Sequence, residues 1–289
     1  MENTDHDITF RAHEIVVGDQ TAYYVDSQAA NKKTPTIIML HGFMSDSQSL
    51  MPLASLLQHE GRIIIPDLPG FGRSAPFAAS DTPSIKMYAQ WLDGFLAAVV
   101  KAKEPVIILG YSFGAYIVQV YLGGGDVDAR VRGSVLLCPV TRIHWRANFY
   151  TSVFLRLSEL SEEMAERAWR SQHDFTTVYL SKMNHPRKKL DLIRYRRREM
   201  SFFNPLLVRD LFVDIRNLDT EEYFSHIDVP VRALLADKDN LADNNNTYRL
   251  METYASENDI YEVDGVGHLA PLEAPERIKD TVREALKNL

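Results

Sequence analysis

The sequence predicts an α/β fold, in which helices flank a mostly parallel sheet of roughly eight strands and a helical cap is inserted. Three observations indicate this fold. Short continuous apolar runs recur along the chain, as in strands that are buried on both faces. Segments with helical spacing of apolar residues alternate with these runs. The alternation stops between Pro139 and Asp228 and then resumes.

The strands begin with a hairpin, because Gly18-Asp19 separates two β-like runs and is a turn signal. The six later runs are apolar and short enough for strands. In chain order, the expected strands are residues 10–17, 20–27, 36–40, 63–65, 106–109, 134–137, 231–236 and 260–263. Helices are expected over residues 84–101, where Asp81-Thr82-Pro83 is a start signal, and over residues 115–122 and 275–289.

The interruption of the alternation divides the chain. We expect residues 1–138 and 229–289 to form the α/β core and residues 139–228 to form the helical cap. The cap segment has 15 Lys and Arg residues against 13 Asp and Glu, although the whole chain has a net charge of −7. The change of charge and of periodicity at the same boundaries supports the division.

Composition narrows the class of protein. The net charge of −7 argues against a general nucleic-acid binder, which needs a positive surface. The single cysteine, Cys138, has no partner for an internal disulfide, and no apolar run reaches the ~18 residues of a membrane span. The acidic N-terminus lacks the apolar stretch of a secretory signal. We therefore expect a soluble cytoplasmic protein that needs no metal or cofactor; the sequence leaves its oligomeric state open.

One pentapeptide carries a specific chemical signal. Gly110-Tyr111-Ser112-Phe113-Gly114 follows an expected strand and precedes an expected helix, which is the context that gives the G-x-S-x-G motif its meaning. The turn is tight, so its glycines avoid side-chain clashes. Ser112 then lies at a helix N-terminus, where the helix dipole favours a developing negative charge. We interpret Ser112 as a nucleophile.

A serine hydroxyl needs a base to take its proton. His268 follows the expected strand 260–263, so it should lie at the same edge of the sheet as Ser112. A carboxylate should orient this histidine. The strand 231–236 ends in Asp237-Lys238-Asp239, from which we choose Asp239, with Asp237 as the alternative. The predicted catalytic residues are therefore Ser112, Asp239 and His268.

With these residues identified, the sequence resembles the α/β-hydrolase fold superfamily over essentially its whole length, in particular single-chain serine hydrolases with a helical lid. His41-Gly42-Phe43 resembles the oxyanion segment of that family. Asp67-Leu-Pro-Gly70-Phe-Gly72-Arg-Ser74 resembles its D-x-x-G-x-G-x-S turn. Gly267-His268, with Glu273-Ala-Pro275, resembles its histidine loop. The resemblance implies that the backbone N–H groups of Phe43 and Phe113 are the oxyanion donors.

The resemblance also bears on the reaction. Related haloalkane dehalogenases and epoxide hydrolases have an aspartate nucleophile, which Ser112 excludes. Ring-cleaving C–C hydrolases typically carry a tryptophan after the histidine, where this chain has Leu269. We therefore expect a carboxylic-ester hydrolase, similar to carboxylesterases, acting on esters or thioesters of small to medium acyl groups. The alternatives are a non-catalytic ligand receptor on the same fold, and a C–C hydrolase, lyase or acyltransferase that uses the same site.

A basic segment in the expected cap has two interpretations. Residues 181–198 contain eight basic side chains and only one acidic one, Asp191. The basic residues are Lys182, Arg187, Lys188, Lys189, Arg194, Arg196, Arg197 and Arg198. Most such runs are solvated helix faces, here with Glu162, Glu163 and Glu166 as partners. The alternative is that Arg194, Arg197 and Arg198 attract an anionic substrate or an anionic surface.

Overall fold

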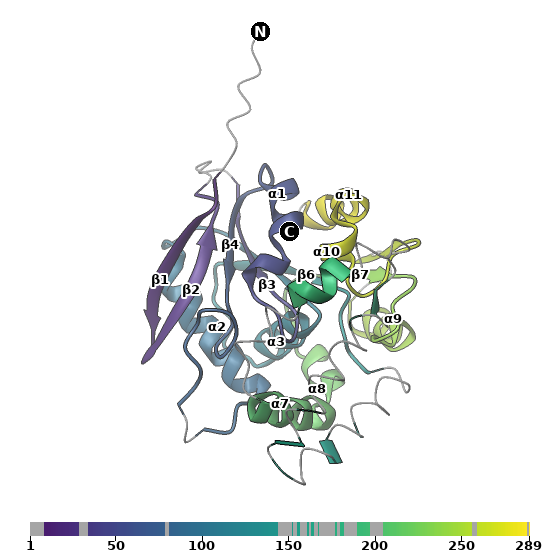
Figure 1. The fold of residues 1–289 in the computed structure, drawn as a ribbon. Helices are drawn as coiled ribbons and strands as arrows, with labels where there is room; N and C mark the ends of the chain where they lie inside the picture. The colour runs from purple at the N-terminus through teal and green to yellow at the C-terminus, as the bar shows by residue number, and fades with distance from the viewer. Residues whose placement is uncertain are drawn as a thin grey trace.

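The computed structural model describes residues 9–28, 34–78, 81–143, 205–255, 259–287 and 289, and parts of the stretch between 143 and 205. Those parts are residues 152, 155, 156, 161, 163, 164, 167, 177, 180, 181 and 190–196. An eight-stranded sheet forms the centre of the molecule (Figure 1), in the order β1-β2-β4-β3-β5-β6-β7-β8. The strands β1 and β2 are antiparallel to their neighbours, and all other pairs are parallel. The predicted fold class is confirmed.

The observed strands match the expected runs to within a few residues. They are β1 Arg11–Val17, β2 Gln20–Asp26, β3 Thr36–Leu40, β4 Arg62–Pro66, β5 Val106–Tyr111, β6 Val131–Leu137, β7 Val231–Ala236 and β8 Ile260–Val263. The pair Val17–Gln20 closes the hairpin, and Gly18 takes a φ of 64° in the turn, which favours glycine. The buried strands were predictable because they are apolar on both faces.

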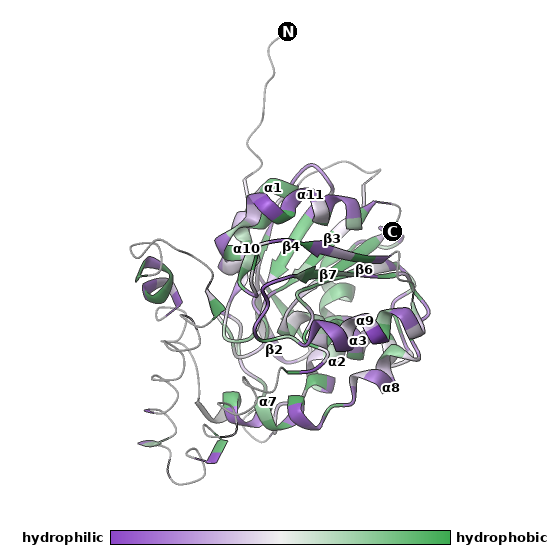
Figure 2. Ribbon diagram, turned by 90° about the vertical axis from the view of Figure 1, so that its right-hand side faces the viewer, coloured by the Kyte–Doolittle hydropathy of each residue, from purple (hydrophilic) through white to green (hydrophobic). Residues whose placement is uncertain are grey.

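Helices cover both faces of the sheet. They are the 3-10 helix η1 Ser47–Ser49 and the α-helices α1 Met51–Leu57, α2 Ile85–Val99, α3 Phe113–Gly123, α7 Pro205–Asn217, α8 Thr220–Phe224, α9 Asn244–Tyr254, α10 Ala270–Glu273 and α11 Pro275–Leu286. Figure 2 shows α1 and α11 over one face and α2 and α3 over the other. Among the described helices, none is long and apolar enough to cross a membrane.

Each face of the sheet has its own apolar core, because successive strand residues point to opposite sides. In β3, Ile38 and Leu40 pack with α2 and α3, whereas Ile37 and Met39 pack with α1 and α11. The helix α3 is buried on every side, consistent with its central place. This arrangement fixes the C-terminal end of β5, from which the chain enters α3 at Ser112.

The chain between β6 and β7, which we call the β6–β7 connection (residues 138–230), spans the segment 139–228 for which the sequence predicts a helical cap. Its described parts include α7, α8 and the helical residues 190–196. Thr141, near its start, accepts a 2.9 Å hydrogen bond at its backbone oxygen from the hydroxyl of Thr220, near its end. The Thr141 hydroxyl also bonds the hydroxyl of Thr247 in α9 at 2.9 Å. The two ends of the connection are thus joined to each other and to the core.

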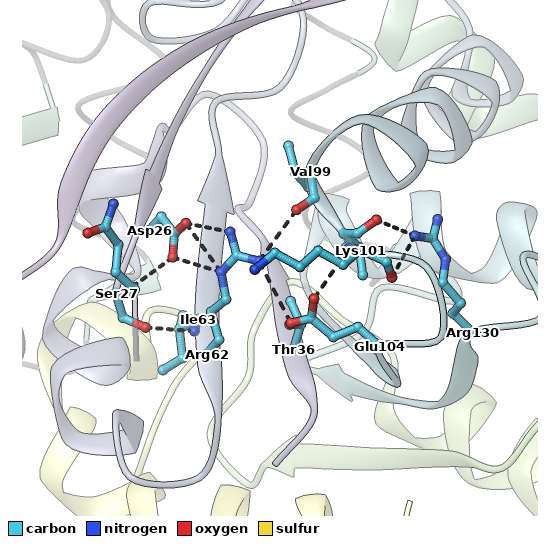
Figure 3. A network of polar contacts seen from close by, with 11 residues as sticks. Asp26, Ser27, Thr36, Arg62, Ile63, Val99, Lys101, Glu104 and Arg130 are labelled. Atoms are coloured by element: carbon cyan, nitrogen blue, oxygen red, sulfur yellow. Dashed lines mark hydrogen bonds and ion pairs between the residues drawn. The ribbon is translucent and has the colours of Figure 1, made fainter. Parts of the chain in front are cut away.

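A polar network lies where β3 and β4 begin (Figure 3), at the sheet edge opposite Ser112. Arg62 donates to Asp26 from Nη2 at 2.7 Å and from Nε at 3.1 Å. Its second η-nitrogen lies 3.7 Å from Glu104, and Glu104 accepts from the hydroxyl of Thr36. The hydrogen bond to Asp26 raises the pKa of Arg62 although partial burial works against this. The network therefore joins the ends of strands and is structural.

Replacement of Arg62 by Met is expected to lower the free energy of unfolding by about 2 kcal/mol, because it leaves a buried carboxylate without its partner. The side chain of Asp26 is 5% exposed, so water compensates poorly. Urea denaturation measures the loss. As a control, adding Asp26→Asn to Arg62→Met should recover part of it, since the unpaired charge is then gone. Equal stability of Arg62→Met and the native chain would contradict the assignment.

Candidate active site

Ser112 lies in a strained turn between β5 and α3. Its φ of 52° and ψ of −107° are conformations that a residue with a side chain rarely adopts. The flanking glycines are needed for close approach: a Cβ on Gly110 would lie 2.6 Å from the oxygen of Gly114, and one on Gly114 would lie 2.4 Å from the oxygen of Leu40. The sequence therefore forces Ser112 above the end of the sheet, as the motif predicts.

The structure brings together the three residues predicted for catalysis. The Oγ of Ser112 lies 2.8 Å from Nε2 of His268, and Nδ1 of His268 lies 2.7 Å from Oδ2 of Asp239. An ionised carboxylate only accepts hydrogen bonds, so the ring proton lies on Nδ1 and Nε2 accepts from the serine hydroxyl. Ser112 and His268 are 6% and 3% exposed, and the Asp239 side chain is fully buried. The arrangement can move a proton from serine to histidine.

The two candidate acids play different parts in this geometry. Asp239 accepts from the N–H groups of Leu241 and Ala242 with Oδ1, at 2.8 and 3.0 Å, which leaves Oδ2 facing His268. Asp237 instead pairs with Lys238 at 2.6 Å. Partial burial works to raise the pKa of Asp237, but the Lys238 pair and backbone N–H groups of the histidine loop outweigh it and lower this pKa. Of the two, the structure places Asp239 beside the histidine.

The predicted oxyanion donors come from two loops that meet beside Ser112. Phe43 follows β3, and Phe113 is the first residue of α3. The next residue after Phe43, Met44, takes a φ of 56°, which turns the loop away from the strand direction. Among the hydrogen bonds between residues that the structure describes, none uses the N–H of Phe43 or Phe113. Both groups can therefore donate to an oxygen atom of a substrate.

A buried histidine holds the first of these loops. Nδ1 of His41 donates to the oxygen of Gly42 at 2.8 Å, and its Nε2 accepts from the N–H of Leu68 at 3.0 Å. Burial lowers the pKa of His41, although Asp67 and Asp46 act in the opposite direction, so the ring stays neutral and keeps Nε2 as an acceptor. His41 thus connects the oxyanion segment to the D-x-x-G-x-G-x-S turn.

The contacts of Asp67 explain which residue types occur in that turn. Its two carboxylate oxygens accept from the N–H groups of Ser47 and Arg73, at 2.7 and 2.9 Å. A Cβ on Gly72 would lie 2.2 Å from Oδ2 of Asp67, so only glycine fits there. The Ser74 hydroxyl donates to the backbone oxygen of Asp67 at 2.6 Å. These contacts of Asp67 and Ser74 hold together the loops that lie beside the site.

Sequence analysis missed Tyr111, which positions the histidine loop. Its hydroxyl donates to the backbone oxygen of His268 at 2.9 Å, and the two rings lie 5.7 Å apart. Burial raises the pKa of Tyr111 well above its ordinary value, so the hydroxyl keeps its proton. The residue occupies the first variable position of the G-x-S-x-G motif. Its only sequence signal was the alternation of β5, which points Tyr111 to the α11 side of the sheet.

The basic segment of residues 181–198 is described only in part. Lys182, Arg187, Lys188, Lys189, Arg197 and Arg198 lie outside the described residues. Arg194 is exposed and lies 3.3 Å from Asp191, whereas Arg196 is only 7% exposed. Of the acidic residues expected to face this segment, Glu163 pairs with Arg167. Because the side chain of Arg196 is buried, Arg196 is not part of a solvated helix face. Attraction of an anionic partner by Arg194, Arg197 and Arg198 stays a prediction.

Comparison with known proteins identifies relatives of the chain. A family model described as "Alpha/beta hydrolase family" matches residues 37–281. An uncharacterized hydrolase of Saccharomyces cerevisiae, YNR064C, is 44% identical over 66 residues, which span 22% of each chain. The matched part of that relative is thus about a fifth of its length.

Solved structures share the fold over nearly the whole chain. A thermophilic esterase from Thermogutta terrifontis superposes with a TM-score of 0.74 at 19% identity, over 96% of this chain and 98% of the esterase. An enol-lactonase from Burkholderia xenovorans LB400 gives a TM-score of 0.77 at 15% identity, over 96% of this chain and all of the lactonase. At these identities the likeness shows the fold alone.

Proposed function

The chain belongs to the alpha/beta hydrolase family, and from this premise we propose that it is a serine hydrolase that cleaves carboxylic esters or thioesters of small to medium acyl groups. The observation that carries the proposal is the unbroken line of hydrogen bonds from Ser112 through His268 to Asp239, with lengths of 2.8 and 2.7 Å. A buried serine, histidine and carboxylate in this order are what nucleophilic acyl transfer requires.

In the proposed reaction, the Oγ of Ser112 attacks the carbonyl carbon while His268 takes the hydroxyl proton at Nε2. The carbonyl π electrons move to the oxygen, and the N–H groups of Phe43 and Phe113 stabilise its charge, each by about 3 kcal/mol. His268 then gives its proton to the leaving alcohol or thiol, and the acyl group stays on Ser112. Water, deprotonated by His268, attacks the carbonyl carbon of the acyl-enzyme. The bond from this carbon to Oγ of Ser112 then breaks, His268 returns the proton to Oγ, and the carboxylic acid leaves. Asp239 stabilises the imidazolium at both stages.

Turnover of model substrates tests the proposal. Purified protein is offered p-nitrophenyl esters from acetyl to octanoyl, the matching thioesters and a simple lactone, which covers the chemistry of the esterase and lactonase neighbours. We expect hydrolysis of the shorter esters well above background. A fluorophosphonate should block this activity and label Ser112, as peptide mass spectrometry would show. Absence of turnover and of labelling would favour the non-catalytic receptor.

A further inference from the structure

The loop between β3 and η1 carries the first of the two predicted oxyanion donors. We call it the oxyanion loop (residues 41–47). At its start, Nε2 of His41 accepts from the N–H of Leu68 at 3.0 Å. At its end, the N–H of Ser47 donates to Oδ1 of Asp67 at 2.7 Å. The D-x-x-G-x-G-x-S turn therefore fixes the oxyanion loop at both ends, and the donor lies between them.

Between these two ends the oxyanion loop has a strained backbone. Met44 directly follows the donor residue, Phe43, and has a φ of 56°, in the left-handed region that residues with a side chain rarely adopt. Such a conformation persists only where the surrounding contacts over-determine it. Loss of a contact near one end should therefore let Met44 relax and move the N–H of Phe43.

Asp46 supplies contacts of this kind near the second end. Its Oδ1 accepts from the N–H of Gln48 at 2.8 Å and caps η1. Its backbone oxygen accepts from the N–H and the hydroxyl of Ser49, at 3.2 and 2.8 Å. A Cβ on Gly72 would lie 2.5 Å from Cγ of Asp67 and 2.9 Å from Cβ of Asp46. Asp46 thus joins η1 to the oxyanion loop and packs against the turn that holds both.

These contacts use the carboxylate oxygen of Asp46 and do not need its charge. Burial raises the pKa of Asp46 and the charge of Asp67 adds to this, whereas His41, Arg73 and a backbone hydrogen bond act in the opposite direction. Tyr23, from β2, also interacts electrostatically with this carboxylate. The native fold therefore disfavours the ionised form. An asparagine would cap η1 as well as aspartate does and would carry no charge.

Resting on the proposed function, we propose that Asp46 is a positioning residue, which holds the N–H of Phe43 in place for the oxyanion of the transition state. It acts through the hydrogen bond that caps η1, and its charge is dispensable. A donor aimed at the oxyanion stabilises the transition state more than the bound substrate. Displacement of this donor should therefore lower kcat and leave KM nearly unchanged.

Two variants of Asp46, assayed with p-nitrophenyl acetate, test the role of the cap. Asp46→Ala lacks the acceptor, so kcat should fall by about tenfold to hundredfold with KM within about twofold of native. Asp46→Asn should keep kcat within about twofold, because its amide oxygen can accept the same hydrogen bond. If circular dichroism shows that Asp46→Ala is unfolded, Asp46→Gly replaces it, since glycine removes the same acceptor at a smaller cost to a helix start.

The stability of Asp46→Asn tests whether the charge is dispensable. Its melting temperature should exceed that of the native chain at pH 7, because the variant lacks a charge that the native fold disfavours. The raised pKa of Asp46 means that this gain should vanish as the pH falls below the ordinary value of 3.8, where the native carboxyl is protonated as well. A lower melting temperature of Asp46→Asn at pH 7 would overturn the dispensable charge.

Asp219 provides the matched control, because its side chain makes the same kind of cap away from the site. It accepts from the N–H of Glu221, two residues on, at 3.0 Å and caps α8. The helix α8 packs against the end of α3 opposite Ser112, where a Cβ on Gly123 would lie 2.2 Å from the oxygen of Tyr223. Asp219→Ala should lower the melting temperature and leave kcat and KM at native values.

The outcomes separate this inference from the proposed function. A fall in kcat in Asp46→Ala, with native rates in Asp46→Asn and Asp219→Ala, supports the positioning role. Native kcat in Asp46→Ala, equal losses in both Asp46 variants, or an equal loss in Asp219→Ala overturns it even though the enzyme hydrolyses esters. Failure of the native chain to hydrolyse any ester overturns the proposed function, and the positioning role with it.

Discussion

Ser112→Ala is expected to abolish ester hydrolysis, with kcat falling by roughly 10⁴- to 10⁶-fold, because the variant lacks the atom that forms the acyl-enzyme. The fold should survive. The substitution removes one oxygen whose hydrogen bond is to His268, and alanine meets the same backbone strain at φ 52° as serine does. Initial rates on p-nitrophenyl acetate and thermal melting followed by circular dichroism measure the two effects separately.

An exposed serine provides the control for this variant. Ser55, in α1, donates to the backbone oxygen of Met51 at 2.9 Å and lies far along the chain from the site. Ser55→Ala should keep native kcat and KM. If Ser112→Ala hydrolysed esters at near-native rates with an unchanged melting temperature, the nucleophile would lie elsewhere and the catalytic assignment would be wrong.

The sheet could be predicted because each of its buried strands has a recognisable local sequence pattern. Runs such as residues 36–40 are apolar on both faces, and only a central strand between two helical layers buries both. Helices whose sequences show weaker helix-forming patterns were missed. The helix α9 starts with Asn244, Asn245 and Asn246, which are poor helix formers, and is held by the Asp243 cap and by its packing on β7. Tertiary contacts outweigh propensity there.

The residues of the candidate site, like the helices and strands, could be predicted only in part. Ser112 and His268 could be placed because each follows a parallel strand, and such strand ends meet at one edge. The sequence led us to choose Asp239, but spacing alone left Asp237 as an alternative, because the answer depends on how the turn after β7 directs two nearby carboxylates. The Asp239 N–H donates to the oxygen of Ala236, which closes this turn. The support that Tyr111 gives to the histidine loop was beyond sequence reasoning, since its contact with the oxygen of His268 depends on how that loop folds back.

Asp239→Asn is expected to lower kcat by about 10⁴-fold, the loss that accompanies a wrongly placed histidine proton in a serine triad. An asparagine amide can donate to Nδ1 of His268, which moves the ring proton to Nε2. In that tautomer Nε2 cannot accept the proton of Ser112. The effect should appear in kcat with little change in KM, because Asp239 is buried behind the histidine and does not face the substrate.

Asp237→Asn is the matched comparison, two residues away and with the same change of charge. Asp237 pairs with Lys238 and accepts a hydrogen bond from the N–H of Val266. Because partly exposed ion pairs contribute little, Asp237→Asn should leave kcat within about fivefold of the native value. The lowered pKa of Asp237 means that its carboxylate stabilises the fold only while ionised. Any fall in melting temperature should therefore be present at pH 7 and vanish as the pH falls through and below the ordinary value of 3.8. A larger loss of kcat in Asp237→Asn than in Asp239→Asn would assign the catalytic carboxylate to Asp237, against the 2.7 Å contact between Asp239 and His268.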